Sequence, residues 1–159
     1  MRVRRLILMR HGQAEPGHGL PDHERSLTPD GRGEAERVGR AFVAAGWIPE
    51  FVRSSDAART RQSWASVAGA VSVTGPVSFT RDLYLPTLER LAADAAGWAP
   101  ELHTCLCLGH NPGWSDAASR LSGHRIGMGT ANAALLEAEG DDWADAFTRR
   151  WTLVDLLRP

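Results

Sequence analysis

The sequence contains no lysine, and only two of its 159 residues are cysteine and two asparagine. All 18 basic residues are therefore arginine, which makes any single arginine a weak functional signal. The formal net charge is −1. A balanced charge of this kind gives no indication of nucleic acid or of an acidic membrane surface as a partner.

The two cysteines, Cys105 and Cys107, lie in the apolar run CLCLG. On a strand they face the same way, too close in sequence for an ordinary disulfide and too few for a zinc site. We expect buried thiols, which fit the reducing cytoplasm. The basic start of the chain is followed by only four apolar residues, 6–9, before Arg10. That stretch is too short for an export signal or a membrane span, so we expect neither.

The length is that of one ordinary domain, and no repeat, low-complexity tract or clear linker interrupts the chain. We therefore expect a single domain over residues 1–159. The first expected strand, 3–9, is dense enough in apolar residues to be buried on both faces. Further strands are expected at 51–54, 77–80, 103–109, 130–138 and 148–156, with a turn at the EGDD sequence between the last two.

Four helices are expected between these strands. The first is capped by Thr28, has Pro29 at its first position and ends at Gly46. The second follows Ser55 or Asp56 as cap, and the third spans 86–97. The fourth has Asn111 as cap and Pro112 in the first position. This alternation predicts an α/β fold, a three-layer αβα sandwich on a mostly parallel sheet. The last two strands are expected to add to it as an antiparallel pair.

Several residues suited to anion chemistry follow the ends of strands. Arg10, His11 and Gly12 end the first strand, Arg59 lies in the first turn of the second helix, and His110 follows the strand at 103–109. Ligands of open α/β sheets bind beyond the carboxyl ends of the strands, close to helix N-termini that favour anions. Arginines suit a phosphate or carboxylate, and a neutral imidazole can attack phosphorus.

Each of these residues also has an ordinary explanation when taken alone. Arg10 can pair with an acid, Arg59 can lie on a solvated helix face, and Asn111 can cap a helix without any catalysis. The combination at one sheet edge is what favours a phosphoryl site.

Four segments together resemble the signature of the histidine phosphatase superfamily, the phosphoglycerate-mutase-like fold. In chain order they are LMRHGQAE, RSLTPDGRGEAERVG, VRSSDAARTRQSW and CLGHNPG, between residue 5 and about 115. The short length and the LGHNPG sequence look most like the SixA-type phosphohistidine phosphatases.

The resemblance implies a role for each matching position. His11 would be the nucleophile that carries a phosphohistidine intermediate, while Arg10, Arg59 and His110 would hold the phosphate oxygens. Substrate-binding roles are implied for Gly12, Arg25 and Asn111. Neither a metal nor another cofactor is expected, because the arginines and the second histidine supply the positive charge.

Larger members of this superfamily use a glutamate as general acid, and the matching position here falls near Leu85. Asp82 and Glu89 are nearby, although Glu89 is expected to face solvent on the third helix. An imidazole, with a pKa of about 6.5, leaves far more easily than an alkoxide, whose conjugate acid has a pKa near ~15.7. A missing acid therefore favours protein phosphohistidine, or an activated phosphate, over a sugar phosphate as substrate. The alternatives are a small phosphomonoester, with Asp82 or Glu89 as acid, and a non-catalytic phosphate-binding module. The sequence does not indicate the oligomeric state.

Overall fold

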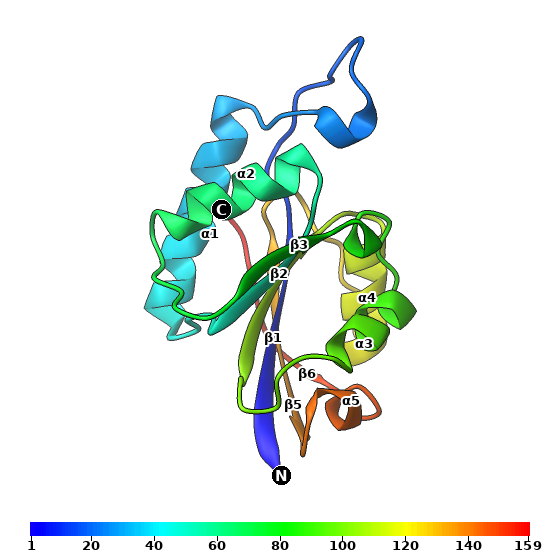
Figure 1. Cartoon of the computed structure of the whole chain (residues 1–159). Coiled ribbons are helices and arrows are strands. Elements are labelled where there is room, and N and C mark those ends of the chain that lie inside the picture. The colour runs from blue at the N-terminus through cyan, green and yellow to red at the C-terminus, as the bar shows by residue number, and fades with distance from the viewer.

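The computed structural model describes all residues, 1–159, and shows a twisted sheet covered by helices on both faces (Figure 1). The six strands lie in the order β3-β2-β4-β1-β5-β6. Their bounds are β1 Arg2–Arg10, β2 Phe51–Ser55, β3 Val77–Thr80, β4 Thr104–Gly109, β5 Ala133–Gly140 and β6 Thr152–Leu157. The α-helices are α1 Pro29–Ala45, α2 Ala58–Ala68, α3 Leu88–Ala95, α4 Gly113–Ser122 and α5 Trp143–Ala146, with short 3-10 helices η1 Asp22–Glu24 and η2 Arg81–Leu83.

The pairing of the strands confirms the expected mixed sheet. β4 pairs in parallel with both β1 and β2, and β3 pairs in parallel with β2. β5 and β6 are antiparallel additions on the far side of β1. The α/β sandwich expected from the sequence is therefore confirmed.

Strand β1 is the centre of the core, because its side chains alternate between the two helix layers. Ile7 and Met9 pack with α1 and α2, whereas Leu6 and Leu8 pack with α3, α4 and α5. All four side chains are completely buried. Burial on both faces leaves the strand no freedom to slip by one residue, since a slip would exchange the two faces.

The first helix begins and ends where the sequence predicts. The Thr28 hydroxyl accepts a hydrogen bond from the Gly31 N–H at 2.9 Å, and Pro29 occupies the first helical position. Gly46 ends α1 with a φ of 73°, a left-handed conformation that glycine adopts without strain.

Three other helix starts differ from the prediction. α2 begins only at Ala58, because β2 extends through Ser55, and no side chain caps the helix. α4 begins at Gly113, one residue later than expected. Asn111 still reaches its first turn, since its side-chain oxygen accepts from the Ser115 N–H at 3.2 Å. α3 is shorter than 86–97 and is capped by Thr87.

The connection between β5 and β6 is longer than the predicted turn. Asp142 accepts a hydrogen bond from the Asp145 N–H and so caps the short helix α5. Trp143 on this helix is almost completely buried against the α3 and α4 layer. β6 therefore starts at Thr152 rather than at residue 148.

Cys105 and Cys107 are free and completely buried, with 3.6 Å between their sulfur atoms. Burial raises the pKa of the Cys105 thiol, which keeps it protonated.

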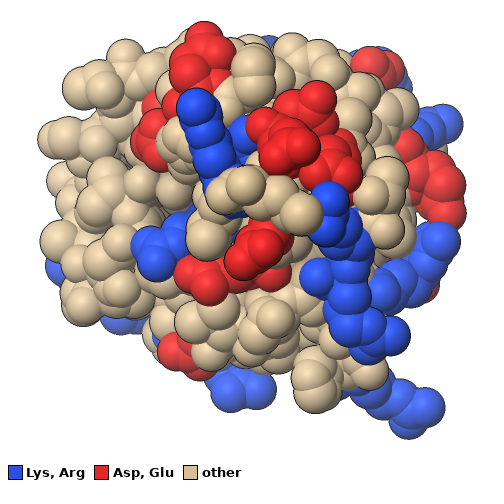
Figure 2. All heavy atoms as spheres, turned by 90° about the horizontal axis from the view of Figure 1, so that it is seen from below, with Lys and Arg blue, Asp and Glu red and all other residues tan.

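Arginine and acidic side chains lie side by side on the lower face of the molecule (Figure 2). No helix has the length and apolar content to cross a membrane.

Replacing Leu8 by alanine tests the importance of β1. Because Leu8 is completely buried, we expect a loss of about 2–5 kcal/mol in the free energy of unfolding. Val3 on the same strand is 50% exposed, and Val3→Ala should cost below about 1 kcal/mol. Urea denaturation measures both. Equal losses in the two variants would contradict the role assigned to β1.

Candidate active site

Two histidines meet where β1 and β4 end side by side. His11 follows β1 and His110 follows β4, and the His11 N–H donates to the Gly109 carbonyl at 3.2 Å. Their ring centroids lie 5.2 Å apart. Both side chains are buried, so the parallel pairing of the two strands brings the two imidazoles together in a largely dry place.

The surroundings of His11 leave one ring nitrogen available for chemistry. Its Nδ1 lies 2.6 Å from the Gly12 carbonyl oxygen, which can only accept, so we place the proton on Nδ1. Nε2 then carries a lone pair. Burial, and then the nearby Arg59 and Arg10 charges, lower the pKa of His11 to about 4, so its imidazole is neutral at pH 7.

In His110, by contrast, one ring nitrogen is bonded and the other lacks a hydrogen-bond partner. Its Nε2 lies 2.8 Å from the Ser55 hydroxyl, whose oxygen also accepts the Ala57 N–H. The Ser55 hydroxyl has no other acceptor, so we take it to donate to Nε2 and place the His110 proton on Nδ1, which is buried without a partner. Burial, with a further contribution from Arg59, lowers the pKa of His110 to about 3.

Two arginines near the histidines also have a buried nitrogen without a hydrogen-bond partner. Arg10 donates from Nη1 to the Met128 carbonyl, and Arg59 donates to the Asp22 carbonyl at 2.8 Å and to its carboxylate at 3.0 Å. In both residues Nε is buried with no hydrogen-bond partner. Only four buried side-chain polar atoms in the molecule lack a partner: Arg10 Nε, Arg59 Nε, His110 Nδ1 and Trp151 Nε1.

This concentration of unpaired donors points to an anionic ligand. An unpaired buried donor costs about 1–3 kcal/mol, and folded proteins contain few of them. Burial also lowers the pKa of Arg10, as expected for a cation whose counter-charge is incomplete. A phosphate presents several acceptor oxygens at once, as a group of donors of this kind requires. No three His, Cys, Asp or Glu side chains are grouped so that they could hold a metal ion.

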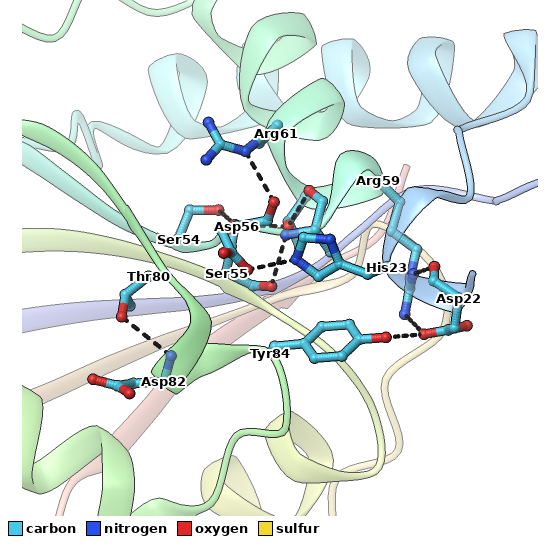
Figure 3. Close-up of polar contacts among 12 residues, drawn as sticks. Asp22, His23, Ser54, Ser55, Asp56, Arg59, Arg61, Thr80, Asp82 and Tyr84 are labelled. Carbon is cyan, nitrogen blue, oxygen red and sulfur yellow. Dashed lines mark hydrogen bonds and ion pairs between the residues drawn. The ribbon is translucent and has the colours of Figure 1, made fainter. Parts of the chain in front are cut away.

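The wall beside Arg59 contains two residues that sequence reasoning missed. The Asp22 carboxylate accepts hydrogen bonds from Arg59 and from the Tyr84 hydroxyl (Figure 3). It also accepts one from Arg25. The hydrogen bond from Tyr84, followed by that from Arg25, holds the pKa of Asp22 well below its usual range. Burial and the neighbouring Asp22 raise the pKa of Tyr84, so the phenol stays protonated. The one signal for Tyr84 was its place next to Leu85.

A cavity of about 720 Å³ lies beside Arg59 and His110, and neither Arg10 nor His11 is part of its lining. Its lining includes Asp22, Arg59, Tyr84, Leu85, His110 and Asp116. Leu85 therefore does lie at the site, and its side chain cannot donate a proton.

Neither of the two acids considered as proton donors lines this cavity. Asp82 lines a neighbouring one and points away from Asp22 and Arg59 (Figure 3). Glu89 is exposed on α3, as expected, and pairs with Arg120 at 2.7 Å.

The residues expected to bind substrate also make structural contacts, and their role in substrate binding stays a prediction. A Cβ on Gly12 would lie 2.3 Å from the Gly31 carbonyl oxygen, so this glycine permits the close approach of α1, and its N–H donates to Ser63. Asn111 lines the cavity, but its amide bonds the Met128 carbonyl and Ser115. Arg25 bonds Asp22 and the Glu15 carbonyl and does not line the cavity.

Residues 6–84 match the model of the histidine phosphatase superfamily (branch 1). The chain belongs to the histidine phosphatase superfamily. An uncharacterized chloroplastic protein of Arabidopsis thaliana is 37% identical over 170 residues, which cover 98% of this chain and 78% of the relative.

Solved structures confirm the SixA-type resemblance. A protein of Nakamurella multipartitia that is described as a putative phosphohistidine phosphatase SixA is 27% identical, with a TM-score of 0.86 and coverage of 100% of this chain and 98% of that one. The SixA structure from Agrobacterium tumefaciens shares the fold at 24% identity, with a TM-score of 0.82 and 98% of each chain covered.

The lowered pKa values can be measured directly by NMR titration of the histidine side chains. We expect His11 and His110 to titrate near pH 4 and pH 3, because burial disfavours their charged forms. In urea both should return to about 6.5. Since the unfolded state then binds more protons, these two groups make stability rise with pH between about 4 and 6.5. A native-state pKa near 6.5 for either ring would contradict the burial described.

Proposed function

We propose that the protein hydrolyses protein phosphohistidine through a covalent phosphohistidine intermediate on His11. The superfamily and its structural relatives support phosphatase activity as such. The observation that carries the mechanism is the set of three unpaired buried donors, Arg10 Nε, Arg59 Nε and His110 Nδ1, beside the free Nε2 of His11. Together they present a nucleophile and the ligands of its target.

The reaction has two steps. In the first, His11 Nε2 forms a bond to phosphorus while the bond from phosphorus to the substrate imidazole breaks, and the leaving nitrogen keeps the electron pair and takes a proton from solvent. In the second, a water oxygen bonds to phosphorus, the bond to Nε2 breaks and the water proton is released. Inorganic phosphate leaves, and His11 is neutral again.

The charge of the transferring group is held by fixed donors. Arg10, Arg59 and His110 are already directed by bonds to Met128, Asp22 and Ser55, so little reorganisation is needed during transfer. The two arginines supply the positive charge, and the neutral His110 adds a hydrogen-bond donor. The pKa of His11, about 4, keeps the nucleophile unprotonated at neutral pH without a general base.

The lining of the cavity supports phosphohistidine as the substrate class. Leu85 stands at the position expected for a general acid, and Asp82 and Glu89 lie outside the cavity. General acid catalysis is worth about 10²–10⁴-fold, which an alkoxide leaving group needs and an imidazole largely does not. The name of the Nakamurella relative agrees with this choice.

A small-metabolite phosphomonoesterase is the second candidate. It is favoured by one observation, the protonated Tyr84 hydroxyl on the cavity wall, which is a possible proton donor. A phosphate-binding module without turnover is disfavoured, because it has no need of a neutral His11 with an unbonded Nε2.

The test compares wild-type protein with His11→Ala on a ³²P-phosphohistidine protein and on a panel of phosphomonoesters. We expect acid-labile label on the wild type, none on His11→Ala, and a loss of hydrolysis of roughly 10³-fold or more. His124→Ala is the matched control, because His124 is exposed and distant in sequence from the site, and it should behave as wild type. Full hydrolysis by His11→Ala would overturn the mechanism, and faster turnover of a phosphomonoester would favour the second candidate.

A further inference from the structure

The carboxylate of Asp22 occupies a ring of three hydrogen-bond donors. Its Oδ1 accepts from Arg25 Nη1 at 2.9 Å, and its Oδ2 accepts from Arg59 Nη2 at 3.0 Å and from the Tyr84 hydroxyl. The donors come from three separate segments: Arg25 from the loop after η1, Arg59 from helix α2 and Tyr84 from the residue after η2. Figure 3 shows the last two beside Asp22. Two guanidinium groups and a phenol form an anion site of the kind that binds a carboxylate.

This anion site adjoins the phosphate ligands, because Arg59 belongs to both. The Nη atoms of Arg59 hold Asp22, while its Nε is the unpaired nitrogen proposed for phosphate. A substrate with a carboxylate close to its phosphoryl group would need these same outer donors. Asp22 already supplies that carboxylate from within the chain.

An external carboxylate competes poorly with Asp22. The Asp22 backbone carbonyl also accepts from Arg59 Nη1, and its neighbour His23 bonds Asp56 at 2.7 Å, so the loop is fastened at two points. A tethered group has a high effective concentration. An acidic substrate group that stays beside Asp22 instead meets a like charge.

The other charged residues around the cavity do not replace these donors as a binding site for a substrate carboxylate. Arg59 is the one arginine in the lining, and Asp116 is a second acid there. Arg120 lies 3.5 Å from Asp116 and is also paired with Glu89. Arg81 lies over the Tyr84 ring and lines the neighbouring cavity.

We propose that Asp22 is a specificity-determining residue, which excludes phosphate compounds with a second acidic group near the phosphate and admits neutral or cationic leaving groups. Discrimination then comes from an unfavourable contact with the wrong substrate as well as from contacts with the right one. The inference rests on the proposed function only in taking Arg59 as a phosphate ligand.

The test uses two phosphate esters of nearly the same shape, glycerol 3-phosphate and 3-phosphoglycerate, which differ by a carboxylate in place of a hydroxymethyl group. Calorimetry in a His11→Ala background measures their binding without turnover. With Asp22 present, we expect 3-phosphoglycerate to bind about tenfold more weakly, the effect of one unfavourable charge contact. With Asp22→Ala added, its affinity should rise at least to that of glycerol 3-phosphate.

Three further measurements separate this role from a structural one. Glu24→Ala removes an exposed acid from the same 3-10 helix and should leave the ratio of the two affinities unchanged. Free acetate should weaken the binding of 3-phosphoglycerate to the Asp22→Ala protein, because it enters the vacated ring of donors, and should leave glycerol 3-phosphate unaffected. Asp22→Asn, with the same size and no charge, is measured beside Asp22→Ala in case the smaller residue unfolds the loop.

The inference would be overturned if the ratio of the 3-phosphoglycerate affinity to the glycerol 3-phosphate affinity were the same with and without Asp22. It would also be overturned if neither ester bound to the His11→Ala protein, with or without Asp22→Ala. The proposed function has a separate readout, the hydrolysis of phosphohistidine protein. Its failure with the affinity ratio intact would remove the substrate assignment and leave the role of Asp22 standing.

Discussion

The burial of β1 between two helix layers is the constraint on which the site depends. Leu6, Ile7, Leu8 and Met9 are completely buried on alternate faces, so the strand has one register and one end point. His11 follows that end point directly, and parallel pairing with β4 places His110 beside it. Side chains placed at the ends of rigid strands keep their geometry better than side chains placed on flexible loops.

Placing charged and polar side chains at this buried end of the sheet costs free energy of folding. Two arginines are brought to the same buried end of the sheet, and three nitrogens there lack partners. The two histidines accommodate the positive charge by staying neutral, since burial lowers both pKa values. Asp22 offsets one arginine from outside, and a bound phosphate would complete the charge balance. Stability is given up at a functional site, as is common in enzymes.

Sequence reasoning succeeded where a residue's role follows from a strand end or from an adjacent helix. The apolar run before Arg10, the cap at Thr28 and the position of His110 after β4 are of this kind. It failed for Asp22 and Tyr84, which meet across 62 positions of the chain and belong to no periodic pattern. It did not foresee the structural contacts of Gly12 and Asn111, because their partners, Gly31 and Met128, are known only once the chain is folded.

The central claim is that Arg10 Nε, Arg59 Nε and His110 Nδ1 converge on a phosphoryl group in front of His11. A crystal structure with orthovanadate tests it most directly. The account predicts vanadium facing His11 Nε2, with vanadate oxygens within about 3 Å of all three nitrogens. Vanadate bound elsewhere, or bound here with two or more of the three nitrogens still unpaired, would contradict it.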